Sequence, residues 1–254
     1  MSDSNFAFLT VRTTSTRLPR KCFLQFGSHS VLEHVINRTI DSNLVPIVCT
    51  SDDKSDDEIE RLTKDLKIEY FRGSLDNKLS RWYECARYFN VDMFHTIDVD
   101  DPFFDPIQVK ESLDLLQNEN LDVVFPTQMS SAGSASVGYS IRTDYLEKVI
   151  AAYRYIEKIE MVDALFNAYP ATKGKILNTS VRDSALIRLT LDYEEDYFLL
   201  DFVRRILGAN CTREMILKLF SENPNLYEIN WFRNMDWSNK QQASRKDIRG
   251  RISN

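Results

Sequence analysis

The chain has 254 residues, with 32 Lys and Arg against 38 Asp and Glu, and therefore a formal net charge of −6. A molecule with this charge repels nucleic acid and phosphate ligands as a whole, so any anion site requires a local cluster of cations. With 43% hydrophobic residues the chain can bury a large core, and its sequence lacks the apolar run of a membrane span and the pattern of a secretion signal.

Apolar, β-rich runs alternate with segments of helical periodicity along the chain. We expect strands at residues 6–9, 45–49, 68–71, 93–97, 121–125 and 187–191. Helical spacing predicts helices at 30–41, 55–66, 76–89, 107–116, 143–155, 160–169 and 212–223, and a further long helix that ends at residue 207. This alternation predicts an α/β fold with a doubly wound, mainly parallel sheet and helices on both faces.

Two segments depart from this alternation. Residues 128–138 are small, polar and uncharged, which predicts a flexible loop that either closes over a substrate or lies on the surface. Residues 238–254 are polar, with five Lys or Arg and one Asp, and are expected to be a mobile tail or an arm that packs on a partner. The prediction is a single domain over residues 1–237, followed by a basic C-terminal tail.

A cationic loop at residues 12–21 is the first candidate for a binding site. No Asp or Glu occurs between Ser4 and Glu33, so the loop has no acidic neighbours in the sequence. It follows an expected strand and precedes an expected helix, which is where α/β proteins bind a phosphate chain with backbone N–H groups and positive charge. A solvated basic loop is the alternative. The cations of the loop are Arg12, Arg17, Arg20 and Lys21.

The same loop resembles a family signature. Its pattern R-x-x-S-T-R-L-P-x-K is similar to the N-terminal motif of cytidylyltransferases of the spore-coat-polysaccharide and keto-deoxy-octulosonate (Kdo) type, which are related to CMP-sialic acid synthetases. That family couples CTP to an acceptor and releases pyrophosphate, and its fold is nucleotide-diphospho-sugar transferase-like. The resemblance implies that Arg12, Arg17 and Lys21, with backbone N–H groups around Ser15, hold the triphosphate. Arg12, Arg17 and Lys21 would also stabilise charge on the departing pyrophosphate.

Carboxylates follow two of the expected strands. Asp98 and Asp100 come after the strand at 93–97, and Asp192 follows the strand at 187–191. The segments TIDVDDPFFDP and IRLTLDYEED resemble the family's G-D-x-P-x-x-D-P and L-R-L-T-V-D-T-P-E-D, which implies that Asp100 and Asp192 bind metal. Mg²⁺ uses one or two carboxylates together with phosphate oxygens, so Mg²⁺ is the expected cofactor. Asp98 and Val99 depart from the family pattern, and an extra negative charge near the nucleotide is unusual there.

Two strand-end turns match family segments that line the base pocket. They are Thr50-Ser51-Asp52-Asp53 and Phe71-Arg72-Gly73-Ser74, although each alone is an ordinary turn. A glycine permits close approach of the backbone to a base, which main-chain groups can then recognise. The residues expected to bind the nucleotide here are Ser51, Asp52, Arg72 and Gly73.

Together these observations predict a Mg²⁺-dependent cytidylyltransferase, which transfers CMP from CTP to a sugar acid or a small phosphorylated acceptor in surface-polysaccharide synthesis. A GT-A-type glycosyltransferase that uses Asp98-Val99-Asp100 as a D-x-D motif is one alternative. A non-catalytic nucleotide-binding protein is another, because Thr14 and Arg20 replace glycines usual in the family loop. The widely spaced cysteines favour a cytoplasmic protein. The family resemblance and the aromatic-rich segment 225–237 imply a homodimer, although packing on the chain's own core would also explain those aromatics.

Overall fold

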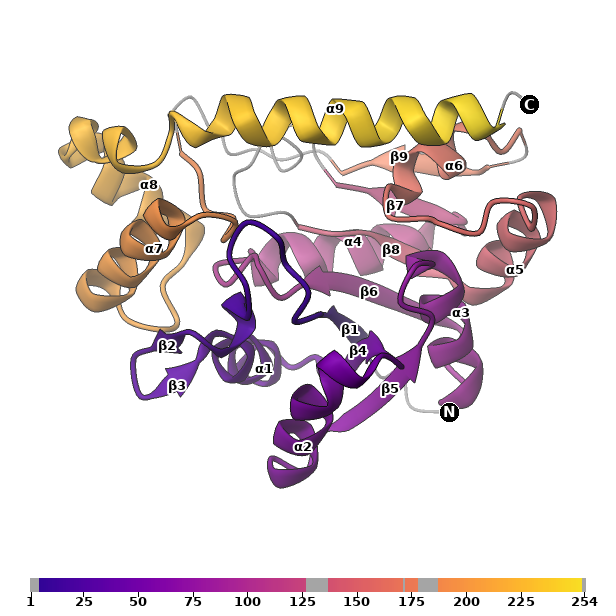
Figure 1. The fold of residues 1–254 in the computed structure, drawn as a ribbon, viewed down its shortest axis with the longest axis horizontal. Helices are drawn as coiled ribbons and strands as arrows, with labels where there is room; N and C mark the ends of the chain where they lie inside the picture. The colour runs from indigo at the N-terminus through magenta and orange to yellow at the C-terminus, as the bar shows by residue number, and fades with distance from the viewer. Residues whose placement is uncertain (1–4, 127–136, 171, 178–186, 253–254) are drawn as a thin grey trace.

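A seven-stranded sheet forms the centre of the computed structural model, which describes residues 5–126, 137–170, 172–177 and 187–252 (Figure 1). The strand order is β5-β4-β1-β6-β8-β7-β9, and β1, β4, β5 and β6 run parallel. Strand β8 lies antiparallel between β6 and β7, and β9 pairs parallel with β7. The mainly parallel sheet confirms the predicted fold class. The strands are β1 Phe6–Thr10, β4 Val45–Ser51, β5 Glu69–Gly73, β6 Met93–Asp98, β7 Val123–Phe125, β8 Ser140–Arg142 and β9 Gly174–Ile176, with a short hairpin of β2 Gln25–Phe26 and β3 His29–Ser30 outside this sheet.

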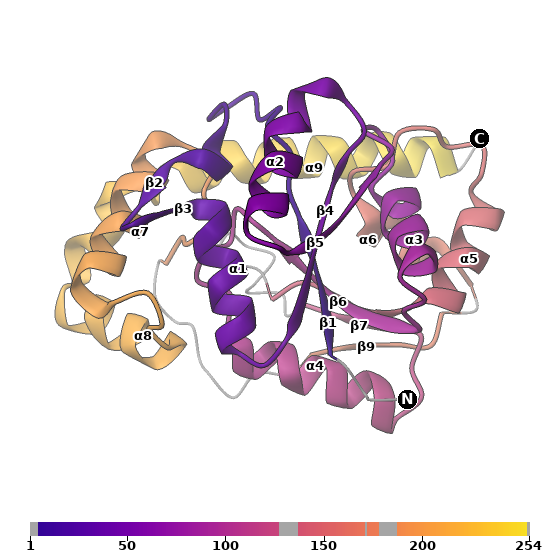
Figure 2. The same ribbon diagram turned by 90° about the horizontal axis from the view of Figure 1, so that it is seen from below.

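Helices cover both faces of the sheet. Successive residues of a strand point to opposite faces of the sheet. On one face, Ala7 and Leu9 of β1 belong to a hydrophobic core with residues of α1, α2, α4, α7 and α8. On the other face, Phe8 belongs to a core with residues of α3, α5 and α6. The turned view shows α1 and α3 on opposite sides of the strands (Figure 2). The helices are α1 Val31–Asp41, α2 Asp57–Asp65, α3 Lys78–Tyr88, α4 Pro106–Asn118, α5 Thr143–Ala152, α6 Val162–Ala168, α7 Glu194–Leu207, α8 Arg213–Glu222 and α9 Arg233–Ile252.

Side-chain caps fix where two helices near the cationic loop begin. Ser30 Oγ accepts a hydrogen bond from the Glu33 N–H at 3.2 Å, and the Glu33 carboxylate accepts one from the Ser30 N–H at 2.6 Å. This capping box begins α1 soon after the loop. The Asn77 side chain accepts a hydrogen bond from the Ser80 N–H at 2.9 Å, so α3 begins at Lys78. The position of Lys78 at the first turn of α3 is therefore set locally.

The segment 187–191, predicted as the last strand, does not form a strand. Its residues are buried, and the Leu191 N–H donates to the Asp100 carbonyl at 2.7 Å. The buried Arg188 forms an ion pair with the buried Asp196, with 2.8 Å between Arg188 Nε and Asp196 Oδ1. An apolar run predicts that a segment is buried, but not that a neighbouring strand forms hydrogen bonds with it. Here residues 187–191 are buried as the connection that leads to α7.

Residues 238–252, expected to be a tail, form the greater part of α9. This 20-residue helix runs along one edge of the molecule, from the α7 and α8 end to α6 (Figure 1). Arg245 Nε donates to Asp163 Oδ2 of α6 at 2.8 Å, and Ile248 is buried in the core that α6 shares. The helix is polar, and no helix among the described residues has both the length and the apolar character needed to cross a membrane.

Asp56 anchors the cationic loop to the sheet. Its carboxylate accepts hydrogen bonds from the Thr13 N–H at 2.8 Å and the Thr13 hydroxyl at 2.7 Å. It also accepts from the Thr50 hydroxyl at 3.1 Å, and from the N–H and the hydroxyl of Ser51 at the end of β4. The side chains of Thr13, Thr50, Ser51 and Asp56 are all buried. The loop and β4 are therefore joined through one buried carboxylate whose hydrogen-bonding capacity is satisfied.

Replacing Asp56 by Asn should destabilise the protein by about 2–4 kcal/mol. The groups around Asp56 all donate hydrogen bonds to it, and the NH2 group of asparagine is itself a donor that cannot accept them. Urea unfolding followed by circular dichroism measures this as a lower midpoint at unchanged slope. The matched control is Asp65→Asn at the exposed end of α2. If both variants unfold at the same urea concentration, Asp56 does not anchor the loop.

The predicted loop at 128–138 lies outside the described residues, except for Val137 and Gly138, which are buried. Gly138 has a φ of +87°, and a Cβ built there would lie 1.8 Å from the Thr96 carbonyl oxygen. The backbone of β6 therefore approaches this position more closely than any side chain permits.

Gly138→Ala should lower the free energy of unfolding by more than about 3 kcal/mol, because the methyl group forces both the backbone angle and the contact with β6 to change. Gly250→Ala is the control, because a Cβ there meets nothing within 4 Å. It should be neutral or stabilise α9 by up to about 1 kcal/mol. Equal unfolding midpoints for the two variants would contradict this account of Gly138.

Candidate active site

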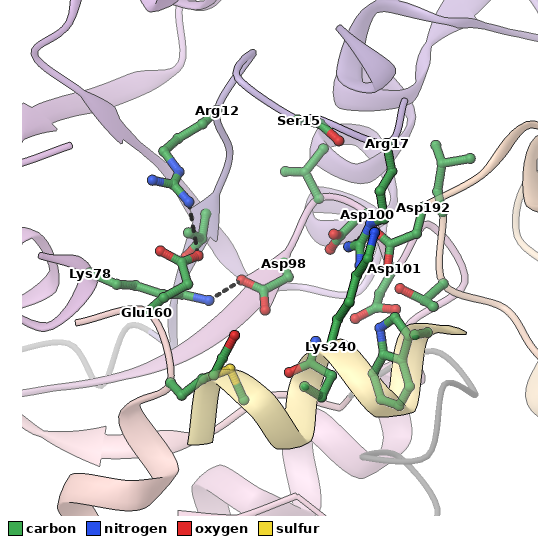
Figure 3. A pocket seen from close by; sticks show the side chains of 18 of the residues that line it. Arg12, Ser15, Arg17, Lys78, Asp98, Asp100, Asp101, Glu160, Asp192 and Lys240 are labelled. Atoms are coloured by element: carbon green, nitrogen blue, oxygen red, sulfur yellow. Dashed lines mark hydrogen bonds and ion pairs between the residues drawn. The ribbon is translucent and has the colours of Figure 1, made fainter. Parts of the chain in front are cut away.

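The carboxyl ends of β1 and β6 open into a cavity of about 650 Å³ (Figure 3). The cationic loop forms one wall, and the segment 190–192 lies beside it. Residues 160–163, at the start of α6, line the cavity next to Arg12, and α9 covers the cavity. Because parallel strands bring their carboxyl ends to one edge of a sheet, side chains from distant parts of the chain meet here.

Lys21 joins the two carboxylates that the sequence singles out. Its Nζ donates to Asp100 Oδ2 at 2.6 Å, to Asp192 Oδ1 at 2.9 Å and to the Leu191 carbonyl at 2.8 Å. Arg17 Nη2 donates to the same Asp192 oxygen at 2.5 Å. Four predicted site residues thus form one cluster, although 171 residues of sequence separate Lys21 from Asp192.

Burial and charge act on the titration of this cluster in opposite senses. Burial alone would lower the pKa of Lys21, but the charges of Asp100 and Asp192 outweigh it and raise that pKa. Burial raises the pKa of Asp100, and the charge of Asp192 adds to this against the effect of Lys21. Burial also acts to raise the pKa of Asp192, but Lys21 and Arg17 lower it. Asp192 is therefore held as the more acidic carboxylate of the pair.

Asp98, which departs from the family pattern, forms an ion pair with a lysine. Lys78 Nζ donates to Asp98 Oδ1 at 2.8 Å, and only 12% of the Lys78 side chain is exposed. Burial would lower the pKa of Lys78, but the charges of Asp98 and Glu160 raise it. The sequence pattern does not single out Lys78, because one lysine in the first turn of a helix looks like a surface residue. Its only signal is its position next to the predicted base-pocket turn.

Arg12 lies on the side of the cavity away from the Asp100 and Asp192 cluster (Figure 3). Its guanidinium donates to the Leu75 carbonyl at 2.8 Å and to Glu160 Oε1 at 2.9 Å. Ser15 lines the cavity from the loop between Arg12 and Arg17, and its hydroxyl accepts a long hydrogen bond of 3.4 Å from the Leu18 N–H. The loop therefore presents cations on both sides of the cavity.

The four residues expected near the base lie together but do not line this cavity. The Asp52 N–H donates to the Gly73 carbonyl at 2.8 Å, which joins the two turns. The Ser51 side chain is fully buried on Asp56. Arg72 donates to the Ser51 carbonyl at 2.9 Å and pairs with Glu60. Their role in nucleotide binding remains a prediction.

The donor set near Lys21 fits magnesium better than a transition metal. Among the described residues no three or more His, Cys, Asp or Glu side chains are grouped as a metal site. Two carboxylates, however, already contact one cationic atom, Lys21 Nζ. Mg²⁺ is held by one or two carboxylates plus substrate phosphate oxygens and water, so a pair of this kind beside a cavity suits it.

Helix α9 supplies a wall that the sequence did not predict. It places aromatic, polar and cationic side chains over the cavity, although residues 238–254 were expected to be a mobile tail or an arm on a partner and Trp237 was part of the aromatic-rich segment. The Arg188 guanidinium lies 5.7 Å from the centre of the Trp237 ring, which connects the start of α9 to the segment that carries Asp192. The α9 residues that line the cavity are Trp237, Lys240, Gln241, Ala243, Ser244 and Arg245.

Comparison with known proteins gives relatives over nearly the whole chain. An uncharacterized protein of Methanocaldococcus jannaschii is 26% identical over 250 residues, which cover 94% of this chain and 97% of that protein. The spore coat polysaccharide biosynthesis protein SpsF of Bacillus subtilis is 26% identical over 238 residues, or 88% and 96% of the two chains.

Solved structures share the fold. A cytidylyltransferase from Leptospira borgpetersenii has a TM-score of 0.76 at 23% identity, covering 88% of this chain and 96% of that one. A CMP:2-keto-3-deoxy-manno-octonic acid synthetase complexed with CTP has a TM-score of 0.60 at 15% identity, with coverage of 80% and 99%. The family model described as cytidylyltransferase matches residues 7–169, more than half of the chain. The resemblance first noted in the cationic loop is confirmed: the protein is a nucleotidyltransferase and belongs to the cytidylyltransferase family.

Proposed function

We propose that this protein is a Mg²⁺-dependent cytidylyltransferase, which transfers CMP from CTP to a sugar acid or a small phosphorylated acceptor. The observation that carries the proposal is the contact of Lys21 with both Asp100 and Asp192 at the edge of a cavity. This arrangement combines a cation for a triphosphate with a carboxylate pair for a metal ion. Family membership favours it over the glycosyltransferase alternative, in which Asp98 and Asp100 would form a D-x-D site.

The biological setting is inferred from the relatives. SpsF of Bacillus subtilis is named for spore coat polysaccharide biosynthesis. Two strains of Rickettsia bellii have a 3-deoxy-manno-octulosonate cytidylyltransferase that is 28% identical over 121 residues, which is 45% of this chain and 48% of that enzyme. We therefore place the reaction in the synthesis of precursors for a surface polysaccharide.

In the proposed reaction an acceptor oxygen attacks the α-phosphorus of CTP. The new bond joins that oxygen to phosphorus, the bond between the α-phosphorus and the oxygen bridging to the β-phosphate breaks, and pyrophosphate leaves. A hydroxyl acceptor releases its proton to water, whereas an ionised phosphate acceptor has none to release. Arg17 and Lys21 would bind the phosphate chain and stabilise the charge that develops on pyrophosphate. Arg12 would hold the chain from the opposite side of the cavity. No covalent enzyme intermediate is needed, so the residues act through position and charge.

Asp100 and Asp192 would hold the Mg²⁺ ion in this proposal. Bound there, Mg²⁺ supplies positive charge to the phosphate oxygens. The low pKa of Asp192 keeps this carboxylate charged and able to bind a cation. Lys21 would exchange its carboxylate partners for phosphate oxygens, which keeps every charge in the cluster paired.

Substrate choice can be tested with a pyrophosphate-release screen of CTP, ATP, GTP and UTP against sugar acids, sugar phosphates and uncharged sugars. We expect release with CTP and Mg²⁺ and an anionic acceptor. Thermal shift gives a second measurement, because a ligand at 100 times its Kd stabilises a protein by about 2.7 kcal/mol. Equal shifts with all four nucleotides would refute a preference for CTP.

Asp100→Asn should reduce turnover by roughly a hundredfold or more, because it removes one charge from the proposed metal pair. Lys21→Ala should instead raise the Kd of CTP about tenfold, because it removes a charge-assisted contact to phosphate. Pyrophosphate release and calorimetric titration of CTP separate the two effects. Normal Mg²⁺-dependent turnover by Asp100→Asn would disprove the metal assignment.

Arg20→Gly is the control for these variants. Arg20 has a left-handed backbone with φ of 58°, which glycine adopts without strain, and its exposed side chain pairs with Glu58 at 2.8 Å. Restoring the family's usual glycine there should leave turnover and CTP affinity close to those of the wild type. A loss of activity in this variant as large as that of Asp100→Asn would mean that the loop works in a different way.

A further inference from the structure

Most of the cations that line the cavity are held in ion pairs. Arg12 pairs with Glu160, Lys78 with Asp98 and Arg245 with Asp163. The cluster described above pairs Arg17 and Lys21 with Asp100 and Asp192. Among the residues that the structure describes, Lys240 is the cavity-lining cation with no ion pair. The six cations are Arg12, Arg17, Lys21, Lys78, Lys240 and Arg245.

Lys240 lies between two anchors of α9. On its N-terminal side Arg233 Nη2 contacts Glu195 Oε1 of α7 at 2.9 Å. On its C-terminal side Arg245 contacts Asp163 of α6 at 2.8 Å. The helix is thus held at both ends of the cavity, and Lys240 extends from it into the cavity (Figure 3). The anchors fix the backbone of α9 at Lys240, so only the lysine side chain has to be ordered when it binds a ligand.

We propose that Lys240 binds the anionic group of the acceptor, a carboxylate or a phosphate, and so makes the enzyme select acidic acceptors. This inference rests on the proposed function. The loop cations Arg17 and Lys21 lie on the wall assigned to the triphosphate. The acids Glu160 and Asp163, which also line the cavity, are already paired with Arg12 and Arg245, so among the described lining residues Lys240 is the cation that an acidic acceptor can bind without breaking an ion pair.

Lys240 can bind an acidic group at low cost. The Arg12 and Arg245 ion pairs must break before either cation can bind a second acid, whereas Lys240 has its three N–H donors available. Gln241 and Ser244 of α9 line the same cavity and can donate to neutral oxygens of an acceptor. Lys240 would therefore add selection by charge to a wall that otherwise offers neutral polar contacts.

The test compares Lys240→Gln, Lys240→Arg and the control Lys246→Gln, an exposed lysine of α9 that does not line the cavity. Acceptors are the sugar acids, sugar phosphates and uncharged sugars of the pyrophosphate-release screen. We expect Lys240→Gln to raise the KM of the active anionic acceptor about 10- to 100-fold, with the Kd of CTP changed less than about twofold. Lys240→Arg should restore most of the acceptor affinity, and Lys246→Gln should match the wild type.

Several outcomes would overturn the inference while leaving the proposed function intact. These are efficient turnover of an uncharged acceptor, an unchanged acceptor KM in Lys240→Gln, and a rise in the Kd of CTP that equals the rise in acceptor KM. An enzyme that binds Mg²⁺ and CTP but neither binds nor converts any anionic acceptor of the panel would also overturn it. Failure of the wild-type protein to bind CTP would instead refute the proposed function.

Discussion

The contact of Lys21 with Asp100 and Asp192 is the interaction on which the cavity depends. Two carboxylates close to each other repel, and burial increases the cost of each charge. A single ammonium group compensates for both, and Arg17 adds a second cation beside Asp192. Asp56 holds the other end of the same loop through Thr13, so the loop conformation is determined at both ends.

Matched charge pairs elsewhere in the cavity follow the same physical rule. Lys78 accompanies Asp98, and Arg12 accompanies Glu160, so each of these two acids faces a cation. Such pairing holds cations in position before a ligand arrives, which reduces the reorganisation that binding requires. In the proposed reaction, the cations bind phosphate oxygens while the carboxylates bind the metal ion. These charges then pass from one paired arrangement to another.

The C-terminal third of the chain completes the site. The family model ends at residue 169, whereas Asp192 and the whole of α9 come later. The buried pair of Arg188 and Asp196 fixes the connection that carries Asp192 toward Lys21. Relatives that match over nearly the whole length share a segment of this size, and this chain uses it to close the cavity.

The sequence alone determined the doubly wound fold and the cationic loop at 12–21, because hydrophobic periodicity and local composition lie within short windows of the chain. It indicated Asp100 and Asp192 through their positions after apolar runs and through the resemblance of their segments to those of the family. The sequence did not determine that residues 187–191 pair with no described strand of the sheet, nor that α9 covers the cavity. Only the tertiary structure decided the Arg12–Glu160 contact, whose partners are 148 residues apart. Such contacts depend on which buried surfaces meet, and a linear pattern specifies that a surface is buried without specifying its partner.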